Sequence, residues 1–401
     1  MKVVIDRLDH YGRGICNVDG KICFVKNALP KEEVEIEIIK EKKKYLEGKV
    51  VRYLKSSKSR IKENCPYSSI CGGCNLNHIS FEEENAFKTK KVKDLVEKFS
   101  KVDSSLVRDI SFLEDAFYRN KVVFHVRDKR LGFYEENSNR LVEVDQCYLV
   151  VDEINALIPT LKELVVVNAI SEITVRVGNI SKEVMVSLKG KVTNYSPIID
   201  KVDVLVINDK IITKKESITS QIGEYKFLVS YDAFFQVNKN LTEKLYDEIL
   251  KNIKKNHSSN VLDLYCGTGT IGIYISKYVK YVVGIEINKM AVEDAKSNKI
   301  LNSINNIDFM AGKVEELVSS IKDKFDTVIV DPPRSGLDKV TLENVIKISP
   351  DLLIYTSCDP VTLARDLNIL KEFYTIKYIQ PFNMFPRTYH VETVCVLERI
   401  E

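Results

Sequence analysis

The 401-residue chain has no stretch of 18 uninterrupted apolar residues, so its sequence gives no sign of a membrane-spanning helix. Its first residues, MKVVIDRLDHYGRG, meet charge almost at once and contain no apolar signal core. Internal repeats and low-complexity segments are also lacking, which speaks against a solenoid or a disordered chain. We therefore expect a cytoplasmic globular protein, whose length predicts two or three domains.

Charge is nearly balanced overall but unevenly distributed. The net charge is only +3, whereas the segment from Lys40 to Lys62 holds ten Lys and Arg residues against two Glu, a local charge of +8. A solvated charged run is the ordinary alternative for such a segment. Because this run adjoins a predicted small β module, we interpret it as a phosphate-binding face.

The apolar pattern changes twice along the chain. Short alternating strands punctuated by glycine come first, followed by a loop-rich segment with three cysteines, a helical pattern over 81–99, and more short strands. After residue 238, helices alternate with apolar runs of four to six residues, as in a buried parallel sheet. We expect a mixed α/β chain with three domains: an OB-like β-barrel (1–55), a central α+β domain (56–235) and a Rossmann-like α/β domain (236–401).

A glycine-rich turn marks the first ligand site of the last domain. The stretch VLDLYCGTGTIG (261–272) predicts a strand, a tight turn and a helix start, where a ligand can approach the backbone. The next strand ends at Glu286, 23 residues after Asp263. A carboxylate there can accept hydrogen bonds from both hydroxyl groups of a ribose. This arrangement fits NAD and S-adenosylmethionine equally well.

A second turn separates these two cofactors. The strand FDTVIV (325–330) runs directly into Asp331, Pro332 and Pro333. An ordinary proline-rich turn would account for the prolines alone, but not for a carboxylate and proline pair that opens toward the ligand crevice. A D-P-P turn at the end of the fourth strand is typical of methyltransferases. We therefore predict an enzyme that uses S-adenosylmethionine.

The stretch LLIYTSCDP (352–360) ends an apolar strand in a thiol, and this indicates the kind of methyl transfer. Methylation of an exocyclic nitrogen needs no thiol, whereas C5 of uracil is a poor nucleophile. A thiolate that adds to C6 makes C5 nucleophilic, and a base must then remove the C5 proton. Cys358 is therefore the predicted nucleophile. We expect Cys266 and Cys395 to be inert core thiols.

The base that removes the C5 proton is predicted to be Glu392, near the start of the last strand. A carboxylate exposed on a strand is the ordinary alternative for this residue. His390 and Glu398 are the competing candidates for the base, and His390 could equally be a packing residue.

Taken together, VLDLYCGTGTIG, VDPPRSGL, TSCDPVTLARDL, FPRTYHVETV, VSYDAFFQVN and YRNK resemble the RNA uracil-C5-methyltransferases over nearly the whole chain. The resemblance implies that Cys358 is the nucleophile and Glu392 the proton acceptor, with Phe235 in the pocket wall. It also implies four cofactor contacts: Gln236, Tyr265, Glu286 and Asp331. Two positions depart from the family pattern: Asn383, where Asp is common, and Arg387, where a cation is unusual.

Four cysteines suggest a metal site. CPYSSICGGC (65–74) is a C-x5-C-x2-C array, and Cys147 follows 73 residues later. Thiolates at this spacing can hold a structural zinc ion or a [4Fe–4S] cluster, and the chemistry alone leaves both open. A subset of the family carries an iron–sulfur cluster on this pattern. The resemblance therefore implies a [4Fe–4S] cluster on Cys65, Cys71, Cys74 and Cys147.

The amino-terminal segment bears on the substrate. GRGI (12–15), FVKNALP (24–30) and YLEG (45–48) resemble a TRAM domain, an oligonucleotide-binding barrel. Barrel and cluster together are typical of the family's 23S ribosomal RNA enzymes, so we expect a monomer that forms 5-methyluridine in 23S rRNA. The alternatives are the same chemistry on transfer RNA or on two rRNA sites, a non-catalytic iron–sulfur RNA-binding or assembly protein, and an amino methyltransferase.

Overall fold

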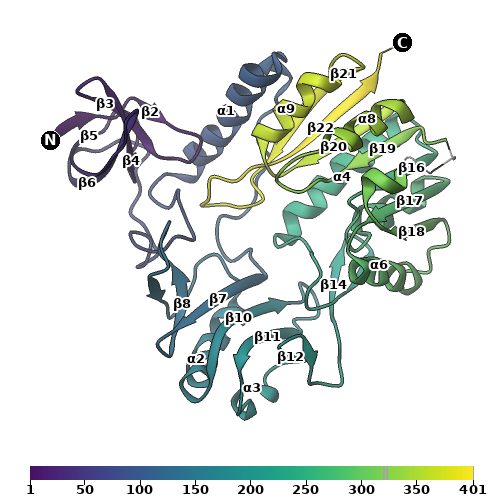
Figure 1. The fold of residues 1–401 in the computed structure, drawn as a ribbon, viewed down its shortest axis with the longest axis horizontal. Coiled ribbons are helices and arrows are strands. Elements are labelled where there is room, and N and C mark those ends of the chain that lie inside the picture. Colours follow the sequence, from purple (N-terminus) through teal and green to yellow (C-terminus); the bar gives the residue numbers. More distant parts are fainter. Residues whose placement is uncertain (319–320, 322–323, 401) are drawn as a thin grey trace.

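The computed structural model describes residues 1–318, 321 and 324–400. The strands of the described residues form three large β-sheets and one separate hairpin. Figure 1 shows the amino-terminal sheet at one side (purple), the central sheet at the bottom (teal), and the carboxyl-terminal sheet opposite (green to yellow). Two 3₁₀ turns complete the description, η1 (Ser104–Leu106) and η2 (Ser276–Tyr278).

The amino-terminal sheet has six strands in the order β1-β5-β6-β4-β3-β2, all antiparallel except for the β4–β6 pair. Its inward side chains form a separate apolar core in which Cys16 and Cys23 face each other across two strands. The expected OB-like β-rich module is therefore present. Its strands are β1 (Lys2–Val4), β2 (Arg7–Leu8), β3 (Gly14–Val18), β4 (Lys21–Lys26), β5 (Glu33–Glu41) and β6 (Tyr45–Lys55).

The central sheet is mixed, with the order β13-β12-β11-β10-β7-β8-β9. Helix α2 (Asp152–Val167) buries its apolar face against this sheet, and α3 (Ser196–Ile199) packs beside α2. The strands are β7 (Lys121–Arg127), β8 (Arg130–Tyr134), β9 (Leu141–Glu143), β10 (Ala169–Val177), β11 (Val184–Lys191), β12 (Val204–Ile207) and β13 (Lys210–Ile211); β14 (Ile218–Ile222) and β15 (Tyr225–Val229) form the separate hairpin.

The carboxyl-terminal sheet has the order β18-β17-β16-β19-β20-β22-β21, parallel except for β22, which runs against both neighbours. This confirms the expected Rossmann-like sheet. Its strands are β16 (Asn260–Leu264), β17 (Tyr281–Glu286), β18 (Ile307–Ala311), β19 (Thr327–Val330), β20 (Leu352–Ser357), β21 (Tyr374–Phe382) and β22 (Glu392–Arg399). The helices that follow the strands of this domain are α4 (Lys239–Lys255), α5 (Thr270–Ile275), α6 (Lys289–Leu301), α7 (Val314–Leu317), α8 (Lys339–Ile348) and α9 (Pro360–Leu370).

Helix α1 (Phe81–Ser100) matches the helical pattern expected over 81–99, and Ser80 caps it by accepting the Glu83 amide proton. The helix packs against α9, and Figure 1 shows it between the barrel and the carboxyl-terminal sheet. Its buried Val92 and Val96 belong to the apolar core of that sheet. A helix from the segment assigned by sequence to the central domain thus supports the carboxyl-terminal domain.

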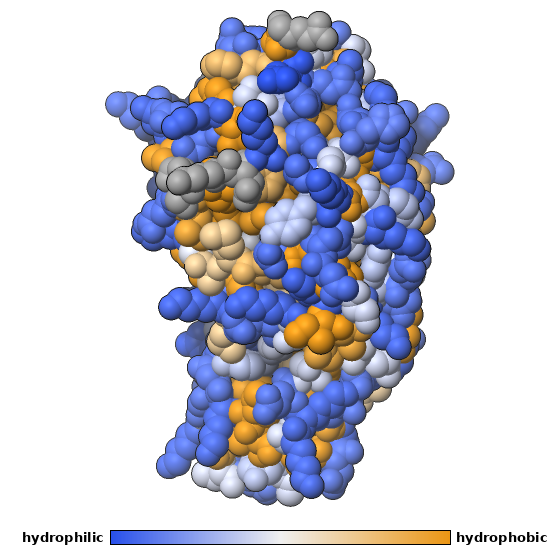
Figure 2. All heavy atoms as spheres, turned by 90° about the vertical axis from the view of Figure 1, so that its right-hand side faces the viewer, coloured by the Kyte–Doolittle hydropathy of each residue, from blue (hydrophilic) through white to orange (hydrophobic). Residues whose placement is uncertain are grey.

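The face shown in Figure 2 is mostly hydrophilic, with apolar side chains in small groups separated by polar ones. Among the described residues, no helix combines the length and the apolar character that crossing a membrane requires.

Candidate active site

Cys358 lies at the junction between β20 and α9. Every residue of β20 is buried, and Cys358 follows it as a half-buried side chain. Asp359 caps α9 by accepting the Val361 amide proton at 2.8 Å, and Pro360 occupies the first helical turn. The stretch TSCDP is therefore a strand-to-helix turn, and it presents the thiol at the carboxyl end of the sheet.

Glu392, the first residue of β22, lies beside this thiol because β22 is antiparallel. Ser357 pairs with Thr393, and the same register continued by one residue sets Cys358 opposite Glu392. The Thr393 hydroxyl donates to the Ser357 carbonyl at 3.1 Å, which fixes the register. The carboxylate is only 5% exposed, so it is not an ordinary surface strand residue.

The two competing candidates for the base, Glu398 and His390, differ from Glu392 in position and in burial or charge. Glu398 sits at the far end of β22 and forms ion pairs with Lys377 (3.2 Å) and Lys255 (3.7 Å). His390 lies two residues before Glu392, with its Nε2 3.5 Å from Arg334 Nη2. Burial, followed by the charge of Arg334, lowers the pKa of His390 to about 4, so its ring is neutral at pH 7.

Acidic groups dominate the electrostatics of this site. Burial and then the charges of Glu392 and Asp331 raise the pKa of the Cys358 thiol to about 12. Burial and the charge of Asp331 also hold the pKa of Glu392 well above its ordinary value, while Arg334 opposes both shifts. Without a further cation, the thiol keeps its proton at neutral pH.

The glycine loop between β16 and α5 has the backbone expected of a ligand cradle. Tyr265, Gly267 and Gly269 all have positive φ, at 64°, 54° and 75°. A side chain at Gly269 would meet the Phe309 ring at 2.5 Å, whereas the position above Gly267 is open. Gly267 donates its amide proton to Glu286 at 3.1 Å, so the carboxylate at the end of β17 adjoins the loop.

These residues fit S-adenosylmethionine, whose sulfonium and ammonium groups are cationic. Asp263 is fully buried; Gly272 N–H donates to one of its oxygens, and the other has no partner among the described residues. Burial, followed by the charge of Asp331, raises the pKa of Asp263 to about 8. A cationic ligand would offset the electrostatic repulsion between these carboxylates. Gln236 is half-buried before α4, and the Tyr265 hydroxyl lies 3.5 Å from the Thr341 hydroxyl.

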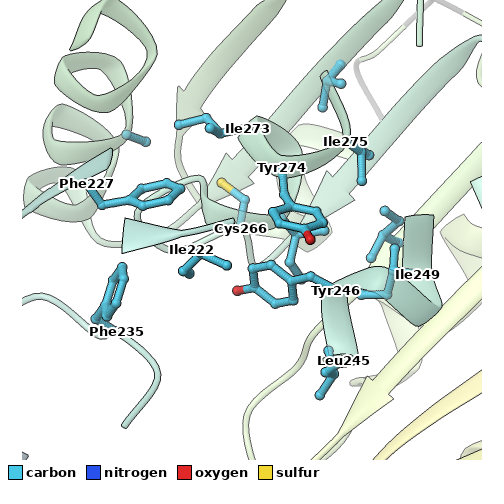
Figure 3. Packing of buried hydrophobic residues seen from close by; sticks show 14 of the residues in the cluster. Ile222, Phe227, Phe235, Leu245, Tyr246, Ile249, Cys266, Ile273, Tyr274 and Ile275 are labelled. Carbon is cyan, nitrogen blue, oxygen red and sulfur yellow. The ribbon is translucent and has the colours of Figure 1, made fainter. Parts of the chain in front are cut away.

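Phe235, expected in the pocket wall, belongs to an apolar core cluster and also lines the cavity of about 480 Å³ described below. It is 5% exposed and packs against Phe227 at 5.8 Å, and Figure 3 shows both rings in the cluster that also contains Cys266. The neighbouring Phe234 is 66% exposed. Alternation along an extended segment explains the difference, because successive side chains point to opposite sides. The core positions expected for Cys266 and Cys395 are confirmed, since both are buried.

Buried ion pairs and hydrogen bonds connect the segment before Glu392 to α1. Lys88 is fully buried and contacts Glu84 at 2.9 Å and the Asn383 amide oxygen at 2.5 Å. Asn383 donates to Glu84 at 3.0 Å, and the Arg387 amide also donates to Glu84. The Arg387 guanidinium pairs with Asp115. The two departures from the family pattern, Asn383 and Arg387, thus both have partners.

We expect the substitution Lys88→Met to destabilise this segment strongly, because it leaves the buried Glu84 without its main cation. Breaking a buried pair in this way costs about 3–5 kcal/mol. The measurement is the free energy of local opening across residues 383–391, obtained from amide hydrogen exchange. Lys90→Met is the matched control: Lys90 pairs with Asp94 on the exposed side of the same helix, and its loss should cost under about 1 kcal/mol. Equal effects of both variants would contradict the expectation.

The four cysteines of the predicted metal site line one cavity of about 480 Å³, together with Arg119, Lys121 and Arg176. Burial raises the pKa of the Cys74 thiol, and the charges of the other three thiols add to this. In the part of the chain that the structure describes, however, no group of three or more His, Cys, Asp or Glu side chains has a geometry that could hold a metal ion. The thiols share a cavity without forming a closed metal site.

Comparison with known proteins agrees with this geometry. The family model described as tRNA (Uracil-5-)-methyltransferase matches residues 198–400, and the TRAM domain model matches residues 1–51. An uncharacterized RNA methyltransferase of Halalkalibacterium halodurans is 34% identical over 445 residues, covering 99% of this chain and 96% of the relative. A second, from Clostridium acetobutylicum, is 34% identical over 449 residues, covering 100% and 97%.

Among solved structures, the Pyrococcus abyssi tRNA (uracil-54, C5)-methyltransferase in complex with S-adenosyl-L-homocysteine is similar over the whole chain. Its TM-score is 0.82 at 26% identity, and the match covers 99% of this chain and 100% of that one. The glycine loop, the D-P-P turn and the thiol at the end of β20 lie in the domain that the family model matches. The chain therefore belongs to the tRNA (uracil-5-)-methyltransferase family, as an S-adenosylmethionine-dependent RNA uracil-5-methyltransferase with an amino-terminal TRAM domain.

Proposed function

We propose that this protein methylates C5 of a uridine through a covalent bond between Cys358 and C6 of the base. The observation that carries the proposal is the pairing of Ser357 with Thr393, which one residue further along brings Cys358 toward the buried Glu392, whose charge acts on the thiol. Thiol and carboxyl thus flank one position, as addition at C6 and proton removal at C5 require. Gln236, Tyr265, Glu286 and Asp331 are the proposed cofactor contacts.

In the proposed reaction, the Cys358 thiol and the Glu392 carboxyl first lose their protons to solvent, which the positive charge of a bound S-adenosylmethionine favours. The thiolate then forms the Sγ–C6 bond, and the electrons of the C5=C6 double bond move toward C5 and O4. S-adenosylmethionine supplies the methyl group, and its C–S bond electrons stay on the departing sulfur. Glu392 next takes the C5 proton, C5=C6 re-forms, and the Sγ–C6 bond breaks to return the thiolate. The thiolate then takes up one proton from solvent while Glu392 keeps the C5 proton, so both groups regain their starting forms and each turnover releases one proton net.

We further propose 23S ribosomal RNA as the substrate, with a single modified uridine. The basic segment from Lys40 to Lys62 covers the last strand of the barrel and the chain that leaves it, which suits a large, folded RNA. The barrel itself does not separate ribosomal from transfer RNA, because the similar transfer RNA enzyme matches 99% of this chain. Modification of transfer RNA, or of two rRNA sites, is therefore the competing outcome.

The test uses 5-fluorouridine-substituted 23S rRNA and transfer RNA with the protein and S-adenosylmethionine. Fluorine at C5 cannot leave as a cation, so elimination stalls with the RNA bonded to the thiol. We expect a denaturation-resistant adduct with 23S rRNA that maps to Cys358. An adduct with transfer RNA alone would replace the substrate proposal. Methyl groups found on adenine or guanine nitrogen without any adduct, or no activity at all, would overturn the mechanism.

Cofactor affinity should depend on pH, because the acidic site holds protons that a cationic ligand displaces. With the pKa of Asp263 raised to about 8, the site must lose a proton below that pH to receive the cation. We expect the affinity for S-adenosylmethionine to rise up to about tenfold per unit between about pH 6 and pH 8, and then to level off. Calorimetry in two buffers of different ionisation enthalpy measures the proton release. A dissociation constant independent of pH would contradict this expectation.

We also propose that Cys65, Cys71, Cys74 and Cys147 hold a [4Fe–4S] cluster. The shared cavity of about 480 Å³ and the four-thiol donor set support this proposal. Protein purified without oxygen should contain about four iron and four sulfide per chain, and Cys71→Ser should lose both. Cys16→Ala, which changes a buried barrel thiol outside this cavity, is the control and should keep them. One zinc per chain in place of iron would contradict the proposal.

A further inference from the structure

A row of side chains joins the outer face of the barrel to the mouth of the active site. Each member contacts the next, although the row draws on five separate parts of the chain. None of its members is fully buried, so the row is not part of a core. In order from the barrel, its members are Tyr45, Phe24, Arg13, Tyr11, Tyr389, His390 and Arg334.

The barrel end of the row alternates rings and a cation. Phe24 on β4 and Tyr45 on β6 meet edge to face, with ring centroids 5.7 Å apart. The Arg13 guanidinium lies 4.4 Å from the Phe24 centroid and 5.5 Å from that of Tyr11. Stacked arginine and aromatic groups of this kind bind unpaired bases and the phosphates between them.

The turn that carries Tyr11 and Arg13 is held in place by one carboxylate. Asp9 accepts the Tyr11 amide proton at 2.9 Å and the Arg13 amide proton at 2.8 Å. Its second oxygen accepts from the Arg13 side chain at 2.8 Å. Tyr11 is nevertheless 56% exposed. The turn therefore presents a large ring to solvent in a fixed position, which keeps the entropic cost of ligand binding low.

The row then crosses from the barrel to the catalytic domain. The Tyr11 and Tyr389 rings lie 5.2 Å apart at 85°, and Tyr389 lies 4.3 Å from the His390 ring. His390 contacts Arg334 at 3.5 Å, and the charge of Arg334 acts on the Cys358 thiol. The row thus ends at Arg334, directly after the D-P-P turn of the proposed active site.

We propose that this row is a binding track for the single-stranded RNA that adjoins the target uridine. Bases stack on Tyr11 and Tyr389, and the phosphates between them meet Arg13 and Arg334. This inference rests on the proposed function for its ligand, and it adds the path by which the strand runs between barrel and active site. A strand held at both ends would keep the extruded uridine at Cys358.

The test measures binding of a fluorescein-labelled, twelve-nucleotide oligouridylate to the full-length protein by fluorescence anisotropy. No S-adenosylmethionine is added, so the result does not depend on methyl transfer. Tyr11→Ala and Tyr389→Ala should each weaken binding about tenfold, whereas Tyr11→Phe should bind within about twofold of the wild type. Arg13→Gln should reduce the slope of log affinity against log salt by about one.

Tyr278→Ala is the matched control. Tyr278 is a 42% exposed tyrosine with a lysine, Lys254, 3.8 Å from its ring, but it lies outside the row. Unchanged affinity in Tyr11→Ala and Tyr389→Ala, with methylation intact, would overturn the track alone. Loss of affinity in both variants of a protein that methylates no uridine would support the track and overturn the proposed function.

Discussion

Replacing Cys358 by alanine should lower the rate of uridine methylation by about 10⁴-fold or more. C5 of uracil does not attack a methyl group until a nucleophile has added at C6, and Cys266, which also follows a strand at this edge of the sheet, is buried in an apolar cluster. The side chain is half-buried at a turn, so alanine should fit without disturbing the fold. Tritium release from RNA containing 5-tritiated uridine measures the rate.

Cys358→Ser tests whether the thiol itself is needed, because a hydroxyl in the same acidic site is far harder to ionise. We expect the serine variant to be as inactive as the alanine variant. Cys16→Ala is the control for a cysteine outside the site, and its rate should stay within about twofold of the wild type. More than about one hundredth of the wild-type rate in Cys358→Ala would rule out the covalent route.

The substitution Glu392→Gln should stop the reaction after methyl transfer. The amide has the shape of the protonated carboxyl, which is the form favoured by burial and by Asp331, so the variant should fold. It has no basic oxygen to accept the C5 proton, however, and turnover should fall about 10²–10⁴-fold. A covalent protein–RNA complex that already carries the new methyl group should accumulate on natural, unfluorinated RNA.

Mass spectrometry of the trapped complex distinguishes this outcome from a simple loss of activity. The control is Glu398→Gln, which changes a carboxylate at the other end of β22 whose partners are surface lysines. Its turnover should stay within about twofold of the wild type. If Glu392→Gln released methylated RNA at the wild-type rate, the base would have to be another group.

The local parts of the site could be predicted from the sequence because each depends on a short segment. The glycine turn, the D-P-P turn and the strand that ends at Cys358 combine a few residues with a strand on one side and a turn on the other. Their positions at one edge of the sheet follow from the rule that ligands bind at the carboxyl ends of parallel strands. The parallel sheet, and the turns at its carboxyl edge that form the proposed cofactor site, could therefore be predicted from the sequence.

The choice among Glu392, His390 and Glu398 depends on longer-range facts. Only the antiparallel register of β22 sets the first of these carboxylates beside the thiol, and no local pattern reports a strand's direction. The sequence of strand β21 (Tyr374–Phe382) has a weak strand signal, because Pro381 and the polar residues of the segment interrupt its apolar pattern.

The bond between α1 and the segment before β22 has a consequence for how the protein is made. Lys88 and Asn383 are 295 residues apart in the chain, yet they form a buried hydrogen bond with each other. During synthesis, α1 leaves the ribosome long before its partners, with Glu84 and Lys88 facing water. Because domains generally fold in order as they emerge, these two side chains must wait until the segment around Asn383 has been translated. A chain that stops before Asn383 should therefore leave Glu84 and Lys88 without their buried partners, although α1 still has its apolar contacts with α9.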